Sequence, residues 1–205
     1  SRAFALSPDD ARILYELDFL HQAVATEPAT RLALLQSHFE VVEKRDDLTA
    51  ELLNLCNITG QLEQAAECLA IRQFHPWEGG EGRITGQFVV NKLRTALGLI
   101  NQHAYTDAIA CLQAALHYPH NLGEGRLVGQ TDNDLYYYLG YCYQQLDQHQ
   151  QAAQHFKCAT QGKQEIGQSR YYNDQPADYL FYQAAALYQL GDTEKAVSLY
   201  ENMVA

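Results

Sequence analysis

Cysteine, histidine, glutamate and serine side chains, which could act in catalysis or bind a metal, are common in this sequence. They lack the spacing that either role requires. The five cysteines form no CxxC pair and the eight histidines show no paired ligand spacing, so the sequence predicts neither a metal site nor a cofactor. Glu78, Glu81 and Glu124 could in principle supply a carboxylate pair for hydrolysis, although loop carboxylates are usually solvated. No serine or cysteine lies in a recognisable nucleophile motif. The sequence therefore does not predict an enzyme.

Glycine-rich loops that carry arginine and glutamate are the polar feature that recurs. Residues 76–87, PWEGGEGRITGQ, align with residues 119–130, PHNLGEGRLVGQ, at an offset of 43 residues. Residues 167–174, GQSRYYND, form a degenerate third copy. If the loops lie side by side, their arginines form a ladder along one edge. The candidate residues of this loop edge are Trp77, Glu81, Arg83, Glu124, Arg126 and Arg170.

Two roles are open for the loop edge. The glycines and prolines can turn the chain after a helix, while arginine and glutamate pair within or between loops. Alternatively, the loops can bind an anionic or polyhydroxyl ligand, because long ordered loops are often functional. The segment GGEGR is not a phosphate loop, since the Lys-Ser/Thr ending and a preceding strand are missing.

Paired helices must position these loops, and a repeat of 43 to 44 residues predicts where the helices lie. Four segments align with an alanine in one column and a large apolar residue four positions later. Such a pair marks one face of a helix that a neighbouring helix can approach closely. The two columns are Ala65, Ala108, Ala152 and Ala196, and Leu69, Leu112, Phe156 and Tyr200.

A further amphipathic helix precedes each of these segments. It is clearest in DNDLYYYLGYCYQQL, where Tyr136, Leu139, Gly140 and Tyr143 predict a buried stripe with Gly140 at the closest contact. Tight turns with helix C-caps are expected between the paired helices. The predicted turn positions are Gly60, His103, Asp147 and Gly191.

These columns resemble the tetratricopeptide repeat, whose pattern of aromatic, Leu, Gly and Tyr, then Ala, aromatic and Ala, is matched from Tyr136 to Ala159. The resemblance covers residues 47–205. It implies an all-α, right-handed superhelix, a solenoid of about ten helices with long loops between repeats. The period departs from the usual one of about 34 residues, and HEAT-type repeats with their longer period are the structural alternative.

The predicted organisation is a capping helical pair over residues 1–46, followed by four repeat units. In the capping pair, Ser7 is the expected N-cap with Pro8 after it, and Phe19 and Leu20 are expected on the apolar face. The units span about residues 47–88, 89–131, 132–175 and 176–205.

The C-terminal face around Val197, Leu199 and Met203 has no following repeat in this sequence, so it is a candidate for contact with another molecule or a second copy. The chain begins at Ser1 without a methionine, which indicates a piece of a longer protein. The segments ARILYELDFL, RLALLQSHFEVVEKRDDLT and FHPWEGGEGR resemble the C-terminal helical repeats of long bacterial proteins with a β-rich, carbohydrate-associated N-terminal part. A link to sugar metabolism is implied by that resemblance alone.

The first helices of tetratricopeptide repeats line a concave groove. Lys, Arg and Asn side chains that would read a C-terminal carboxylate are few in these columns, so that mode of recognition is disfavoured. Tyrosines with a polar tip and an apolar body suit a peptide segment or a sugar ring. The candidate groove residues are Tyr137, Tyr141, Gln144, Asp178, Phe181, Tyr182 and Tyr188.

The composition limits the partners. A net charge of −11 over 205 residues is the wrong sign for binding nucleic acid or an anionic membrane surface. No apolar run is long enough to span a membrane, the opening is too polar for a signal peptide, and the cysteines lie in apolar periodic stretches. We therefore expect a cytoplasmic chain.

Three functions from different classes remain. The leading hypothesis is a non-catalytic interaction or scaffold module that binds a protein or peptide, or an adjacent domain of its parent chain. The alternative is an accessory region of a carbohydrate-active enzyme whose loop edge completes a sugar site. The third is self-association through the C-terminal face.

Overall fold

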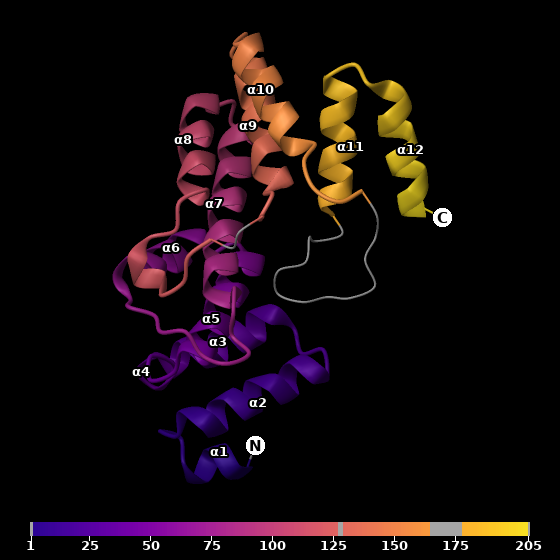
Figure 1. Cartoon of the computed structure of the whole chain (residues 1–205). Coiled ribbons are helices and arrows are strands. Elements are labelled where there is room, and N and C mark those ends of the chain that lie inside the picture. The colour runs from indigo at the N-terminus through magenta and orange to yellow at the C-terminus, as the bar shows by residue number, and fades with distance from the viewer. Residues whose placement is uncertain (1, 127–128, 165–177, 205) are drawn as a thin grey trace. The chain divides into compact units, whose positions relative to one another are not determined.

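The computed structural model describes residues 2–126, 129–164 and 178–204, and every regular element in these ranges is a helix (Figure 1). The predicted all-α fold is confirmed. The described residues form twelve α-helices, because two short ones, α1 (Arg2–Leu6) and α4 (Phe39–Val42), add to the ten that the pattern predicts. Arg170 and the third loop copy lie outside the described residues.

The helices group into two compact units. The first comprises residues 1–91 and 119–124, and the second comprises residues 92–118 and 125–205. Helix α7 (Arg83–Asn101) begins in the first unit and ends in the second. The first unit also holds α2 (Ala11–Ala23), α3 (Pro28–Ser37), α5 (Asp46–Thr59), α6 (Leu62–Ile71) and the 3₁₀ turn η1 (His120–Leu122). The second holds α8 (Tyr105–Ala115), α9 (Asn133–Gln145), α10 (His149–Ala159), α11 (Tyr179–Gln189) and α12 (Thr193–Val204).

The paired helices are joined by turns of one kind. All four predicted turn positions have a left-handed backbone, with φ between 57° at Asp147 and 87° at Gly191. In each turn the following residue donates its N–H to the carbonyl five residues earlier, as Gln61 does to Cys56 at 2.8 Å. This Schellman geometry satisfies carbonyl groups that the helix end leaves open. The predicted turns at Gly60, His103, Asp147 and Gly191 are confirmed.

The small-residue columns form helix contacts. The four alanines of the repeat are at most 4% exposed, which confirms that they are buried. The close contact predicted at Gly140 is also confirmed, because a Cβ atom there would lie 2.6 Å from a ring carbon of Phe156 on α10. At the last hairpin, Leu199 is buried with Ala184 and Leu187 of α11, so it does not belong to an open surface.

The start of α2 differs from the sequence prediction. Asp10, not Ser7, is the N-cap, and its carboxylate accepts hydrogen bonds from the backbone N–H groups of Arg12 at 2.9 Å and Ile13 at 3.2 Å. The helix therefore begins after the turn that contains Pro8. An aspartate that satisfies two open N–H groups is a strong cap, which explains the later start.

The buried face of α2 also differs from the prediction. Phe19 and Leu20 are 55% and 57% exposed, whereas Leu14, Leu17 and Asp18 are buried. Asp18 turns inward because a buried arginine of α3 binds its carboxylate. Leu14, Leu17 and Asp18 share one face of the helix, because they lie three and four residues apart. Phe19 and Leu20 are rotated away from that face and therefore lie outside the buried stripe.

Within the described ranges, none of the helices combines the length and the apolar composition that crossing a bilayer would require.

Candidate protein-interaction surface

Five aromatic side chains of the second unit make a continuous series of ring contacts. Tyr182 on α11 lies 5.8 Å from Tyr137 and 5.7 Å from Tyr138, both on α9, measured between ring centroids. Phe181 lies 5.4 Å from Tyr182 and 5.9 Å from Tyr200 on α12. These separations are typical of stabilising aromatic pairs. We call Tyr137, Tyr138, Phe181, Tyr182 and Tyr200 the aromatic row.

The repeat places these rings in register. Tyr138 and Tyr182 are 44 residues apart, as are Tyr137 and Phe181, so each pair occupies equivalent positions of two successive first helices. Equivalent side chains of stacked repeats become neighbours. Tyr138 is absent from the predicted groove residues, although the same 44-residue offset marks it.

Burial favours the neutral form of two tyrosine hydroxyls in the row, those of Tyr137 and Tyr182. Burial raises the pKa of Tyr182, and so does Tyr138, to which its hydroxyl is hydrogen-bonded. Burial likewise raises the pKa of Tyr137, whose ring also packs 5.9 Å from Phe156 of α10. A neutral phenol can donate and accept a hydrogen bond. Phe181, at 46% exposure, is the open part of the row.

The other predicted groove residues lie outside the row. Tyr141 contacts Tyr105 of α8 at a centroid distance of 6.4 Å. The side-chain amide of Gln144 donates to Gln189 of α11 at 3.2 Å. Tyr188 is 61% exposed, and Asp178 is exposed at the N-cap of α11. The structure thus brings Tyr137, Phe181 and Tyr182 together from the predicted set.

A buried acidic group lies at the start of α9. Asp134 is 7% exposed, and its carboxylate accepts one hydrogen bond from the backbone N–H of Leu135 at 2.8 Å. Burial raises the pKa of Asp134 to about 6, and the charges of Asp132 and Asp178 act in the same direction. Burial also raises the pKa of Tyr179. This end of the helix therefore carries a carboxyl group that changes charge near neutral pH.

Arg126 of the predicted loop edge is bound within the second unit. Its guanidinium group pairs with the buried carboxylate of Asp132 and donates to the carbonyl of Leu116, at the end of α8, at 3.1 Å. The same group lies 5.8 Å from the ring centroid of Tyr118. Gln130 donates to the other oxygen of Asp132 at 2.7 Å. Arg126 thus caps the C-terminal end of α8 with a hydrogen bond to its C-cap carbonyl.

Arg83 is bound within the first unit, in a chain of ion pairs. It pairs with Glu51 of α5, whose other oxygen accepts from Arg31 of α3 at 3.3 Å. Arg31 also donates to both carboxylate oxygens of Asp18 on α2, at 2.9 and 2.6 Å. Asp18, Arg31 and Glu51 are at most 8% exposed. We call Asp18, Arg31, Glu51 and Arg83 the buried ion chain.

The two loop copies differ in structure despite their matching sequences. In the first copy, α7 begins at Arg83 directly after Gly82, so the ITGQ part is helical. In the second copy, Arg126 precedes α9, which begins at Asn133. The expectation that both copies are loops throughout is therefore wrong for the first one. Arg126 stays outside the helix because Leu116 and Asp132 hold its side chain.

The remaining loop residues of the first unit make local contacts. The Trp77 ring packs on Gly80, where a Cβ atom would fall 1.9 Å from a ring carbon. Glu124 accepts a hydrogen bond from the backbone N–H of Gly82 at 2.9 Å, which joins the two loop copies. Glu81 is exposed. Pairing between the loop copies thus uses a backbone donor rather than an arginine.

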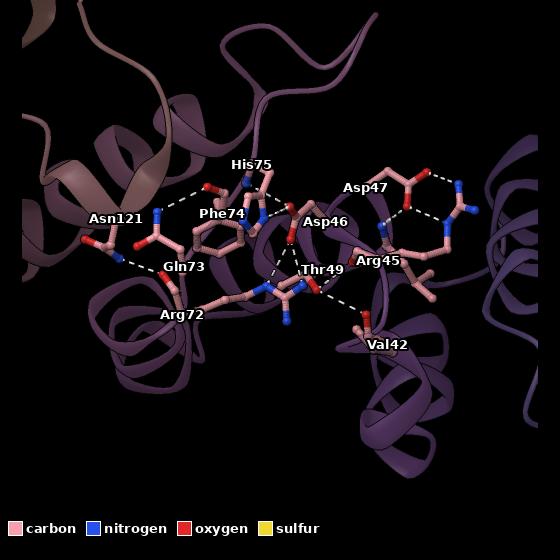
Figure 2. Close-up of polar contacts among 11 residues, drawn as sticks. Val42, Arg45, Asp46, Asp47, Thr49, Arg72, Gln73, Phe74, His75 and Asn121 are labelled. Atoms are coloured by element: carbon pink, nitrogen blue, oxygen red, sulfur yellow. Dashed lines mark hydrogen bonds and ion pairs between the residues drawn. The ribbon is translucent and has the colours of Figure 1, made fainter.

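Two polar residues outside the predicted set fix the segment that leads from α6 toward α7 (Figure 2). The Asp46 carboxylate accepts from the Arg72 guanidinium at 2.7 Å and from the backbone N–H of His75 at 2.9 Å. The side-chain amide of Asn121 donates to the Arg72 carbonyl at 2.8 Å, and the backbone carbonyl of Asn121 accepts from the Phe74 N–H at 2.8 Å. The partners of Asp46 lie 26 and 29 residues away, a separation that no local pattern indicates.

The two buried cysteines are poor nucleophiles. All five are free thiols, and Cys56 and Cys142 are buried. Burial raises the pKa of each of these two thiols to about 11, which disfavours the nucleophilic thiolate. Among the residues that the structure describes, no group of three or more His, Cys, Asp or Glu side chains is arranged to hold a metal ion.

The comparison with protein families agrees with this geometry. The Tetratricopeptide repeat model matches residues 134–157 and 178–205. These stretches cover nearly all of the α9–α10 hairpin and the whole α11–α12 hairpin, which together carry the aromatic row. The two hairpins are therefore tetratricopeptide-like, in agreement with the columns found in the sequence.

Proposed function

We propose that the chain is a non-catalytic interaction module that binds a protein partner, or an adjacent domain of its parent chain, through the aromatic row. The observation that carries the proposal is the series of ring contacts across α9, α11 and α12, which includes the half-exposed Phe181. Tetratricopeptide-like hairpins generally present extended surfaces for protein contact. Fold alone does not fix function, so the row itself has to be tested.

The row favours a particular kind of contact. Its rings offer apolar faces, and its neutral hydroxyls can donate or accept hydrogen bonds. Aromatic residues dominate binding energy at many protein interfaces because they bury large areas with few rotatable bonds. We therefore expect a partner segment with apolar or aromatic side chains near Phe181.

Affinity capture with matched variants tests this proposal. We expect Phe181→Ser to weaken the affinity for a specific partner at least about tenfold relative to the unchanged chain, and so to reduce the amount retained. A tenfold change in affinity corresponds to about 1.4 kcal/mol. The control is Ile71→Ser, because Ile71 is an exposed apolar residue of α6 in the first unit. Quantitative mass spectrometry of the retained proteins gives the result. An identical retained set for all three chains would remove the proposal.

The carbohydrate alternative gains no support from the described residues. Arg83 and Arg126 each pair with a carboxylate of their own unit, which gives both guanidinium groups a structural role. Trp77 packs on Gly80 within its own loop. These contacts of Trp77, Arg83 and Arg126 favour the structural role of the loops, in which arginine and glutamate pair within or between loops.

A further inference from the structure

Asp134 and Asp178 occupy equivalent positions of two successive repeats. They are 44 residues apart, with Asp134 in the first turn of α9 and Asp178 at the N-cap of α11. Each is followed four residues later by a tyrosine of the aromatic row, Tyr138 or Tyr182. Residues four apart lie on one face of a helix, and the later side chain leans toward the earlier one. We call Asp134 and Asp178 the acidic pair.

The acidic pair adjoins the aromatic row. The rings of Tyr138 and Tyr182 lie 5.7 Å apart between centroids, and their hydroxyls are hydrogen-bonded. Burial raises the pKa of Tyr182, and the charges of Asp134 and Asp178 raise it further, so both carboxylates lie near this hydroxyl. The charge of Asp178 likewise adds to the effect of burial on the pKa of Asp134. Two carboxylates and two phenol rings thus form one group at the start of α9 and α11.

The acidic pair lacks a countercharge. Among the ion pairs between described residues, none includes Asp134 or Asp178. Asp132 provides the contrast, because Arg126 neutralises it. Asp134 is 7% exposed, and the hydrogen bond that its carboxylate accepts at 2.8 Å comes from a backbone N–H group. A buried carboxylate without a cation is poorly solvated, so a cationic group from a partner would be favoured here.

We propose that the acidic pair, together with Tyr138 and Tyr182, binds a cationic side chain of the partner protein, arginine in preference to lysine. This inference rests on the proposed function and names the partner's chemistry. A guanidinium group pairs with a carboxylate through its edge and stacks on an aromatic ring through its face, and this site offers both groups. The Phe181 ring lies 5.4 Å from that of Tyr182, so the recognised segment carries arginine next to an apolar or aromatic residue.

Charge complementarity favours this occupant over others. The net charge of −11 attracts a basic segment and repels an acidic one. A second copy of the chain carries the same net charge, which opposes its binding at an acidic site. A metal ion is also a poorer occupant, because in the described part of the chain no three His, Cys, Asp or Glu side chains are arranged to hold one.

Burial of Asp134 gives the site a signature that a structural role would lack. The substitution Asp134→Asn removes an uncompensated charge at pH 7.5, so it should raise the stability of the free chain. The same substitution removes half of the acidic pair, so it should weaken the binding of a cation. A gain in stability together with a loss of binding cannot result from partial unfolding.

Phage-displayed random heptapeptides, selected on the full chain at pH 7.5, provide the probe. We expect the selected sequences to be enriched in arginine, and less strongly in lysine, next to an aromatic or large aliphatic residue. The double variant Asp134→Asn with Asp178→Asn should lose this enrichment. The matched control, Asp107→Asn with Asp147→Asn, removes the same charge from exposed positions of the second unit and should retain it.

Fluorescence anisotropy with the most enriched peptide measures the contact itself. We expect the affinity to fall at least about tenfold with the double variant, or when citrulline, which has no charge, replaces the peptide arginine. Both changes together should cost little more than either alone, because they remove the same interaction. The matched control should stay within about threefold. Urea unfolding at pH 7.5 should show that Asp134→Asn is at least as stable as the unchanged chain.

Several results would overturn the inference. These are selected peptides without arginine or lysine enrichment, the same enrichment from the double variant, or losses that simply add. Arg170 lies outside the described residues, so Arg170→Gln is included in the measurement. Binding that appears only with Arg170→Gln would make an arginine of this chain the occupant and would also overturn the inference.

Affinity capture separates this inference from the proposed function. If Phe181→Ser loses a partner that the double variant retains, and the arginine peptide does not bind, the inference fails while the proposed function stands. If the peptide binds through the acidic pair but Phe181→Ser loses no partner, the proposed function fails. Loss of one partner with both variants, but not with the matched control, would support both.

Discussion

Charge at Asp134 is set by burial rather than by residue type. The carboxyl has an ordinary pKa of 3.8, and burial raises it to about 6. Between these values the folded protein binds a proton that the unfolded chain has released. Folding is therefore favoured most below pH 3.8, and this contribution is lost as the pH rises through about 6.

Replacing Asp134 by asparagine removes this dependence. We expect Asp134→Asn to be more stable than the unchanged chain at pH 7.5 by up to about 3 kcal/mol, because a shift of one pKa unit is worth about 1.4 kcal/mol. At pH 4 the two chains should differ little, since the amide keeps an acceptor for the Leu135 N–H. Urea unfolding at both pH values measures the difference.

An exposed aspartate supplies the control for this substitution. Asp107→Asn changes an exposed carboxylate in the first turn of α8 and should shift stability by less than about 1 kcal/mol at either pH. An equal gain from Asp107→Asn and Asp134→Asn at pH 7.5 would contradict the assignment of the effect to burial.

At the scale of elements, the α9–α10 hairpin depends on one position without a side chain. A Cβ atom at Gly140 would approach the Phe156 ring to 2.6 Å, and Phe156 is 2% exposed. A ring buried among neighbouring helices has little room to move. The interior of a helix normally disfavours glycine, so helix packing outweighs local propensity here.

The substitution Gly140→Ala should therefore destabilise the chain by about 1–3 kcal/mol through overpacking. The matched control is Gly98→Ala in α7, where the added Cβ would meet no atom within 4 Å apart from the adjacent residues and backbone of its own helix. That change should instead stabilise by about 0.5–1 kcal/mol, because alanine favours the helix. Urea unfolding gives both values, and effects of the same sign would refute the packing explanation.

At the scale of the molecule, the first unit is held by charges as well as by apolar packing. The buried ion chain joins α2, α3, α5 and the start of α7 through four alternating charges. The charges of such a chain compensate one another. The loss of one member leaves an unpaired charge in the protein interior, where it is poorly solvated. Its contribution is therefore seen when a single member is removed.

We expect Asp18→Asn to destabilise the first unit by about 3–5 kcal/mol, because Arg31 would lose its bidentate partner. The double change Asp18→Leu with Arg31→Met should recover most of this loss, since no unpaired charge remains. Urea unfolding followed by the fluorescence of Trp77, the one tryptophan, reports on this unit.

A more exposed pair provides the comparison. Arg45 and Asp47 form an ion pair in which the arginine side chain is 39% exposed, so Asp47→Asn should cost only about 1 kcal/mol or less. Similar losses from Asp18→Asn and Asp47→Asn would show that burial does not amplify the interaction.

Much of the fold was predictable from the sequence because its signals are local and repeated. A left-handed turn and a helix face depend on a few neighbouring residues, and recurrence every 43 to 44 residues separates such signals from chance. The candidate surface was only partly predictable. Tyr137, Phe181 and Tyr182 come together as their columns predict, while Tyr141 and Gln144 contact other residues.

By itself, the sequence determined the paired helices, the turns at Gly60 and Gly191, and the buried alanine columns, because periodicity and turn chemistry act over a few residues. The tertiary structure alone decided that Arg83 binds Glu51 and that Asp134 is buried. An arginine pairs with whichever carboxylate the fold brings within reach, and a carboxyl loses water only when distant helices close around it. Neither event leaves a mark in the local sequence.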